Sequence, residues 1–264
     1  MNDSHKKKLY FIASLSFVAG IVNSIGFICF GMFVSHISGH ATFSAVGFSQ
    51  KYYSLAVTSF LSIFFFSFGA IICTLLLNGL IFHKLSRRLL LPILLEIFLL
   101  TYLFFSYVNL TNLSVFNSKS HTSSVFILSV AMGIQNALLR TSQFSALRTT
   151  HLTGTATDFG IAVGDALLWF IKLLRFYFKV PPKKRSLKSL TKMILFVPLY
   201  ILRYARRGSL FFHLVAFFFF IFGAYLGAFC YFKIKMFILL LPISFLISLV
   251  FFLLLRKDKK YSRF

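Results

Sequence analysis

Six apolar stretches, each long enough to cross a lipid bilayer, dominate this sequence of 264 residues. An α-helix needs ~20 mostly apolar residues to span a membrane. The stretches that reach this length are residues 9–33, 54–82, 89–108, 122–143, 209–232 and 236–255. Only 12% of the residues are charged, about half the share typical of water-soluble proteins. We therefore predict an all-α integral membrane protein with six transmembrane helices.

The distribution of basic residues predicts how these helices are oriented. With the N-terminus in the cytoplasm, 24 of the 28 Lys and Arg residues fall on the cytoplasmic side and four fall outside. Cytoplasmic loops of multi-pass proteins are enriched in Lys and Arg, so we expect both termini to be cytoplasmic. The net charge of +23 fits a cytoplasmic face against anionic lipid, and we expect no nucleic-acid partner.

One further stretch, residues 160–178, is apolar in part but carries Asp165, Lys172 and Arg175. Charges at the centre of a bilayer cost several kcal/mol each. We therefore expect an amphipathic helix on the inner surface rather than a seventh span. Together with the basic residues that follow, it forms a predicted interfacial and cytoplasmic insertion at about residues 165–207.

A polar, glycine-containing motif occurs twice, as residues 35–42 (SHISGHAT) and 150–157 (THLTGTAT). Three more pairs of segments recur in the same order: residues 20–23 with 133–136, 66–70 with 220–224, and 89–93 with 239–243. The offset is 113 or 115 for the earlier pairs and 154 or 150 for the later ones. The sequence therefore predicts an internal repeat, with an insertion of about 39 residues in its second copy.

The predicted halves are residues 1–118 and 119–264, with three spans each. An odd number of spans places the two halves in opposite orientations across the membrane. Many secondary transporters have this inverted-repeat architecture, with a binding site near the midplane where helices are broken. The sequence thus predicts two inverted three-helix repeats.

The most specific segments of the chain are residues 19–24 (AGIVNS), 33–40 (FVSHISGH), 133–137 (GIQNA) and 148–154 (RTTHLTG). In these segments the chain resembles the YoaK-type family of uncharacterised bacterial multi-pass inner-membrane proteins. It departs from the family at Asn23, Ser38 and His40, where the family usually has Asp, Thr and Asn. The resemblance implies a bacterial inner-membrane location but no substrate or reaction.

The polar residues of the repeated segments are the predicted substrate-binding residues. They are Asn23, Ser35, His36, Ser38, Gly39, Gln135, Asn136, Thr150, His151, Thr153, Gly154 and Asp158. We predict no catalytic residue, no metal ligand and no cofactor.

Each of these residues also has a structural interpretation. Asn23 and Asn136 lie within predicted spans, where an amide either binds a ligand or hydrogen-bonds a neighbouring helix. His36 and His151 occupy equivalent positions and could bind a solute or a proton, or could serve only packing. Asp158 could hold a cation or proton, or pair with a nearby Arg.

Glu96 lies within the third apolar stretch, and its repeat equivalent is Leu246. Its carboxyl either reaches toward the inner surface or binds a proton in the first half alone. Cys29, Cys73 and Cys230 lie in apolar runs without metal-ligand spacing, so we expect them to be packing residues.

These features favour a transporter or permease for an unknown small solute, with its site at the paired motifs. Two alternatives stay open: a non-catalytic scaffold that contacts lipid through the basic insertion, and a membrane-embedded enzyme. The enzyme is the weakest of the three, because the sequence offers no nucleophile–base arrangement and no pair of carboxylates. The expected partners are the bilayer, anionic lipid, the solute and a second copy of the chain.

Overall fold

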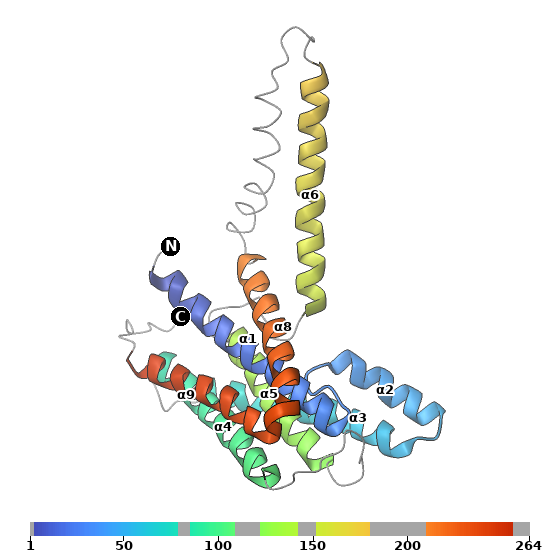
Figure 1. The fold of residues 1–264 in the computed structure, drawn as a ribbon, viewed down its shortest axis with the longest axis vertical. Helices are drawn as coiled ribbons and strands as arrows, with labels where there is room; N and C mark the ends of the chain where they lie inside the picture. Colours follow the sequence, from blue (N-terminus) through green and yellow to red (C-terminus); the bar gives the residue numbers. More distant parts are fainter. Residues whose placement is uncertain (1–2, 79–84, 109–121, 142–151, 180–209, 256–264) are drawn as a thin grey trace. The chain divides into compact units, whose positions relative to one another are not determined.

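The structure is a computed structural model that describes residues 3–78, 85–108, 122–141, 152–179 and 210–255 (Figure 1). Within these ranges every regular element is a helix, so the protein is all-α as predicted. The elements are α1 (Asp3–Phe30), α2 (Ile37–Ser49), α3 (Tyr53–Asn78), α4 (Leu85–Tyr107), α5 (Thr122–Thr141), α6 (Leu152–Lys179), α8 (Leu210–Ile234), the 3-10 helix η2 (Lys235–Leu239) and α9 (Leu240–Leu254).

The chain forms two compact units. The first combines Met1–Thr150 with Ala216–Phe264, and the second is His151–Val215. The first unit therefore contains α1 to α5, most of α8, η2 and α9, while the second contains α6.

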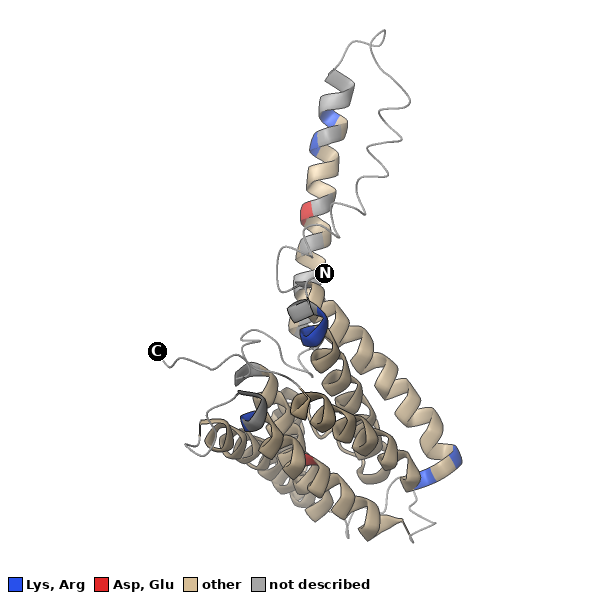
Figure 2. Ribbon diagram, turned by 90° about the vertical axis from the view of Figure 1, so that its left-hand side faces the viewer, with Lys and Arg blue, Asp and Glu red and all other residues tan. Residues whose placement is uncertain are grey.

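Five helical segments are long and apolar enough to cross a membrane. They are Lys6–Phe30, Tyr53–Asn78, Arg88–Tyr107, Thr122–Leu139 and Phe211–Leu254. The first four match the first four predicted spans, and the fifth, of 44 residues, contains α8, η2 and α9. The chain is thus a multi-pass membrane protein. Figure 2 shows Lys and Arg near the ends of the helices of the first unit, and one acidic residue within the bundle.

Helices α1 and α8 lie side by side and run in the same direction. A methyl group added at Gly223 would overlap the Phe17 carbonyl, and one added at Gly227 would lie 2.9 Å from the Ile21 Cα. Residue numbers therefore rise together along the two helices. The Ser24 hydroxyl also donates to the Ala224 carbonyl over 2.8 Å.

Helices α3 and α5 are also parallel. The rings of Phe65 and Phe126 stack with centroids 4.5 Å apart, and a methyl group added at Gly69 would overlap the Val130 carbonyl. Both partners again advance by four residues from one contact to the next.

Contacts of α1 and α4 at their C-terminal ends orient the rest of the bundle. The Phe30 and Tyr107 rings lie 5.6 Å apart, and the Tyr107 hydroxyl hydrogen-bonds the Ser124 hydroxyl over 2.6 Å. The end of α1, the end of α4 and the start of α5 therefore meet. At the other side, Gln135 of α5 donates to the Leu15 carbonyl of α1, so α1 and α5 are antiparallel.

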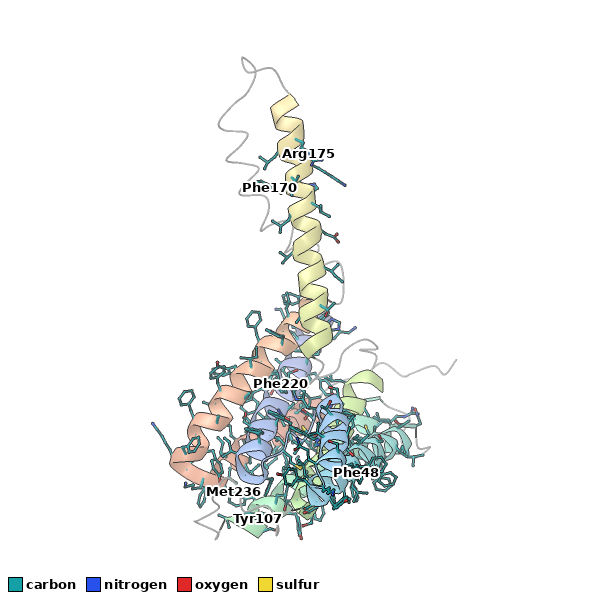
Figure 3. All side chains as sticks on the ribbon, turned by 90° about the vertical axis from the view of Figure 1, so that its right-hand side faces the viewer. Phe48, Tyr107, Phe170, Arg175, Phe220 and Met236 are labelled. Carbon is teal, nitrogen blue, oxygen red and sulfur yellow. The ribbon has the colours of Figure 1, made fainter. Side chains whose placement is uncertain are left out.

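Helix α9 packs on both α1 and α4 and is antiparallel to them. Tyr10 pairs with Phe252 at 5.0 Å and Phe17 with Phe245 at 4.8 Å, so numbers fall along α9 as they rise along α1. The residues that precede α9 contact the C-terminal end of α4, where Tyr107 and Met236 are labelled in Figure 3. Along the chain, α1, α3, α4, α5, α8 and α9 thus alternate in direction.

The second unit has one described helix, α6. It is not among the helices apolar enough to cross a membrane. Asp165, Lys172 and Arg175 are exposed on it, and Figure 3 shows Phe170 and Arg175 along its length. The helix extends over the predicted amphipathic segment and begins eight residues earlier, at Leu152.

Candidate functional site

The first copy of the repeated motif lies where α1 ends and α2 begins. Helix α1 ends at Phe30, and Gly31 has φ +70°, a left-handed conformation that glycine adopts without steric cost. Residues 31–36 are not helical, and α2 starts at Ile37 with His36 as its N-cap residue. The polar motif therefore occupies a sharp break between two helices.

A buried hydrogen bond ties this break to α1. The Ser35 hydroxyl donates to Asn23 Oδ1 over 2.9 Å, and both residues are buried. Asn23 lies roughly two turns before the end of α1. Two residues that the sequence predicted to belong to one site are thus in direct contact.

Two imidazole rings follow at the start of α2. The His40 amide donates to the His36 carbonyl over 3.0 Å, so the two residues are one helical turn apart. His40 is only 2% exposed, and neither of its ring nitrogens makes a hydrogen bond of ordinary geometry within the described residues, although the Phe33 backbone approaches the ring. His36 Nδ1 is likewise buried without a partner there, and the Phe33 ring packs 5.3 Å from the His36 ring.

The surroundings favour the neutral form of His40. Burial lowers the pKa of His40 from 6.5, since an imidazolium is poorly solvated there. The backbone of Phe33 favours the protonated ring and works against this shift, while the neighbouring His36 adds to it. At neutral pH the His40 ring therefore offers one N–H donor and one nitrogen acceptor.

We call Asn23, Ser35, His36 and His40 the imidazole site. Each buried polar atom that lacks a partner costs about 1–3 kcal/mol. A small polar ligand that paired with the ring nitrogens would offset this cost. The site can therefore donate and accept hydrogen bonds.

The other two predicted residues of the first motif do not join this site. Ser38 is exposed, and its carbonyl accepts a hydrogen bond from Thr42 over 3.2 Å. A methyl group at Gly39 would meet only His36 Cβ, at 3.6 Å, so no close approach requires glycine there. His40 was not among the predicted residues. Its spacing of four from His36 was the available signal, but that spacing places them together only in a helix.

The predicted amides of the second half lie on α5. Gln135 is buried and donates to the Leu15 carbonyl of α1, while its Oε1 has no partner within the described residues. Asn136 is buried and donates to the Met132 carbonyl of its own helix over 3.0 Å. Gln135 thus connects α5 to α1 roughly two turns from Asn23.

Of the second motif, Thr150 and His151 lie outside the described residues. Thr153, Gly154 and Asp158 lie in the first two turns of α6, in the second unit, and Gly154 is half-buried. Helices α2 and α6 each begin one residue after the histidine of their motif.

The described residues contain no group of three or more His, Cys, Asp or Glu side chains placed to hold a metal ion. Cys29 and Cys73 are buried and Cys230 is half-buried, all three as free thiols. Cys29 and Cys73 thus lie among the buried core residues, whereas Cys230 does not.

Comparison with known proteins places the chain in a family without a known activity. The family model described as "Protein of unknown function (DUF1275)" matches residues 11–253, nearly the whole chain. No curated protein and no solved structure matches the chain. The match confirms the resemblance based on the repeated motifs, and the protein belongs to the DUF1275 family.

Proposed function

We propose that this protein is a transporter or permease for a small polar solute. It is built from two inverted repeats with three membrane crossings each, and the solute binds at the imidazole site and its equivalent in the second half. The exchange of helix contacts between the halves, the direction of the helices and the unpaired polar atoms of the site support this function.

The observation that carries the proposal is a pair of equivalent glycine crossings. A methyl group added at Gly20 of α1 would overlap the Phe220 carbonyl of α8. One added at Gly133 of α5 would overlap the Phe66 carbonyl of α3. Gly133 lies 113 residues after Gly20, and Phe220 lies 154 residues after Phe66, which are the offsets of the sequence repeat.

The reciprocal contacts follow the same offsets. Gly223 approaches Phe17 in the same way as Gly69 approaches Val130. Gly223 lies 154 residues after Gly69, and Val130 lies 113 residues after Phe17. The first helix of each half therefore packs against the second helix of the other half through the same positions. Helix α1 also packs on α9 as α5 packs on α4. Two halves joined in this reciprocal way support a repeat with approximate two-fold symmetry.

The helix directions support an inverted repeat with six crossings. Helix α8 runs parallel to α1 and so antiparallel to α5, which requires an even number of crossings between α5 and α8. No crossing by α6 satisfies this requirement. The 44-residue segment Phe211–Leu254 is about twice the length of one crossing and turns at η2, so it supplies two.

In this arrangement the first motif faces one side of the membrane and the second motif faces the other. Inverted-repeat transporters bind solutes where helices are interrupted near the repeat interface. Ser35 and His36 lie in the interruption between α1 and α2, beside Asn23 of α1 and His40 of α2, and three imidazole nitrogens of this set are unpaired. A solute with both donor and acceptor groups fits this set.

We further propose the bacterial inner membrane as the location, with both termini cytoplasmic and anionic lipid along the basic segment at about residues 165–207. A second copy of the chain is a possible partner in this proposal, and no enzymatic activity is proposed. The scaffold alternative rests on that basic segment alone and does not account for the unpaired polar atoms of the imidazole site.

A thermal-shift screen of the purified protein against small metabolites and ions tests the proposal. A solute at 100 times its dissociation constant adds ~2.7 kcal/mol to stability, which is readily detected. We expect a stabilising polar solute whose effect is lost in His40→Ala and kept in Asp165→Asn, an exposed position on α6. A stabilising solute that His40→Ala still binds would move the site elsewhere, and no effect across a broad panel would favour the scaffold.

A further inference from the structure

The interior of the first unit contains one acidic side chain that the proposed solute site does not use. Glu96 of α4 is 0% exposed, and neither carboxylate oxygen has a hydrogen-bond partner within the described residues. It is the single glutamate of the whole sequence. An ionised carboxylate in such a place would lose its hydration without compensation.

No described cation lies beside Glu96. Helix α4 packs against α3, α5, α9 and η2. On those four elements the described titratable or charged side chains are Tyr53, Cys73 and Lys235, and on α4 itself they are Arg88, Tyr102 and Tyr107. Of these, Cys73 of α3, also buried, interacts with the Glu96 carboxyl. A thiol cannot neutralise a carboxylate, so no ion pair holds Glu96 in its charged form.

A metal cation also fails to explain this carboxyl. Hard cations such as Ca²⁺ take six to eight oxygen ligands. One carboxylate beside a thiol does not supply them, and the described residues hold no cluster suited to a metal. A proton is the one cation that a single carboxyl can bind without further ligands.

The position of Glu96 connects it to the packing between the two halves. Cys73 lies one turn after Gly69, on the face of α3 that meets α5 at a glycine crossing. The repeat equivalents of Cys73 and Glu96 are Gly227 and Leu246, so the second half lacks this pair. The carboxyl therefore lies near a contact between the halves, on one side of the pseudo-symmetric bundle only.

We infer that Glu96 is a proton-binding site whose carboxyl is neutral while buried between α3 and α4 and releases its proton when these helices separate. In the proposed transport cycle this release would couple proton movement to a change between the two halves. The coupling rests on the proposed function, whereas the proton-binding site does not.

Infrared spectroscopy of the full-length protein in lipid nanodiscs tests the proton-binding site without any substrate. Because the chain has a single glutamate, ¹³C-glutamate labels Glu96 alone, and the difference from the unlabelled protein isolates its carboxyl. We expect the carbonyl band of a protonated acid at pH 7, absent in Glu96→Gln and unchanged in Asp165→Asn. A carboxylate band at pH 7 would overturn the inference.

Alkylation of Cys73 by a maleimide tests the release step. In a Cys29→Ala, Cys230→Ala background, we compare the alkylation rate of the protein that keeps Glu96 with that of Glu96→Gln. The pH is raised through the value at which the infrared band of the protonated acid falls to half. We expect at least a several-fold greater rise in the alkylation rate when Glu96 is present, since its ionisation draws water between α3 and α4. Equal rises would contradict release by helix separation. If infrared spectroscopy detects a protonated Glu96 but the thermal-shift screen finds no stabilising solute, the proton-binding site stands and only the transport proposal is contradicted.

Discussion

At the scale of single residues, the first unit is notable for polar side chains that are buried inside an apolar bundle. Ser35 and Asn23 satisfy each other, whereas His36 and His40 keep unpaired ring nitrogens. A buried polar group without a partner is costly, so its presence at a helix interruption indicates a place for a ligand. The hydrogen-bonded pair Asn23–Ser35 and the unpaired His40 ring therefore make different predictions.

The Asn23–Ser35 hydrogen bond should be measurable by a double-mutant cycle. We expect Asn23→Ala and Ser35→Ala each to lower the free energy of unfolding, and the double mutant to lose less than the sum. The coupling should be about 0.5–1.5 kcal/mol, the net value of a typical intramolecular hydrogen bond. Unfolding of the purified protein in mixed detergent gives the four values. Strict additivity would show that the bond does not hold the break between α1 and α2.

His40 should make stability depend on pH in the acidic range. Its folded-state pKa is below 6.5, so above that pH the ring is neutral in both the folded and unfolded states. Below about pH 6.5 the unfolded state binds the proton more readily, and stability falls as the pH is lowered. We expect thermal unfolding temperatures to decrease from pH 7 to pH 5 in the wild type and to decrease less in His40→Asn. The same slope in both proteins would contradict a buried neutral ring.

The sequence predicted three of the four residues of the imidazole site. Asn23, Ser35 and His36 could be found because each recurs in, or beside, a repeated segment. His40 could not, because its place next to His36 depends on where α2 begins. Ser38 and Gly39 belong to the same motif, yet nothing in the structure near them explains why those residue types are present.

At the scale of elements, the glycine crossings determine which helices pack together. Without a Cβ at Gly20 and Gly133, α1 and α5 can bring their backbones against α8 and α3. Membrane helices gain little from hydrophobic burial against each other, so close backbone contact is a main source of their association. Substitutions at these glycines therefore test the two equivalent interfaces directly.

We expect Gly20→Ala and Gly133→Ala each to destabilise the protein by about 1–3 kcal/mol or more, because the added methyl group would overlap a backbone carbonyl. Gly160→Ala and Gly164→Ala in α6 are the matched controls, since a methyl group there meets nothing within 4 Å. Helical glycine-to-alanine changes without a clash should be neutral or slightly stabilising. Thermal unfolding of the four variants gives the comparison. If only one of Gly20→Ala and Gly133→Ala lowered the stability, the two crossings would not be equivalent.

Most of the helices could be predicted from apolar length alone, whereas α2 could not. It has 13 residues, many of them small or hydroxylated, and is too short to register as a span. The inverted-repeat architecture also predicted a broken helix near the paired motifs. In the structure the backbone is irregular only from 31 to 36, and α2 then carries the rest of the motif.

At the scale of the whole molecule, the proposed repeat is intertwined rather than divided into two separate domains. The described contacts of α1 with α8 and α9, and of α5 with α3 and α4, all join one half to the other. Each half would expose these faces if it were alone. The sequence predicts a boundary between the halves but not this exchange, because contact partners depend on three-dimensional packing.

The intertwined packing predicts how separated halves should behave. We expect residues 1–118 and 119–264, expressed alone, to be degraded or aggregated, and the two halves expressed together to copurify. Gly20→Ala in the first half should weaken this association, while Gly160→Ala in the second should not. Affinity purification through a tag on one half measures the recovery of the other. A half that is stable and monodisperse alone would contradict the exchange.

The central claim is that the two halves are inverted in the membrane. Single cysteines at Ser38 and at its repeat equivalent Thr153, in a background that lacks the three native cysteines, test it with an impermeant maleimide on intact and then opened cells. The account predicts that Ser38→Cys is labelled in intact cells and Thr153→Cys only after the cells are opened. Labelling of both from the same side would contradict the inverted repeat and, with it, the proposed transporter.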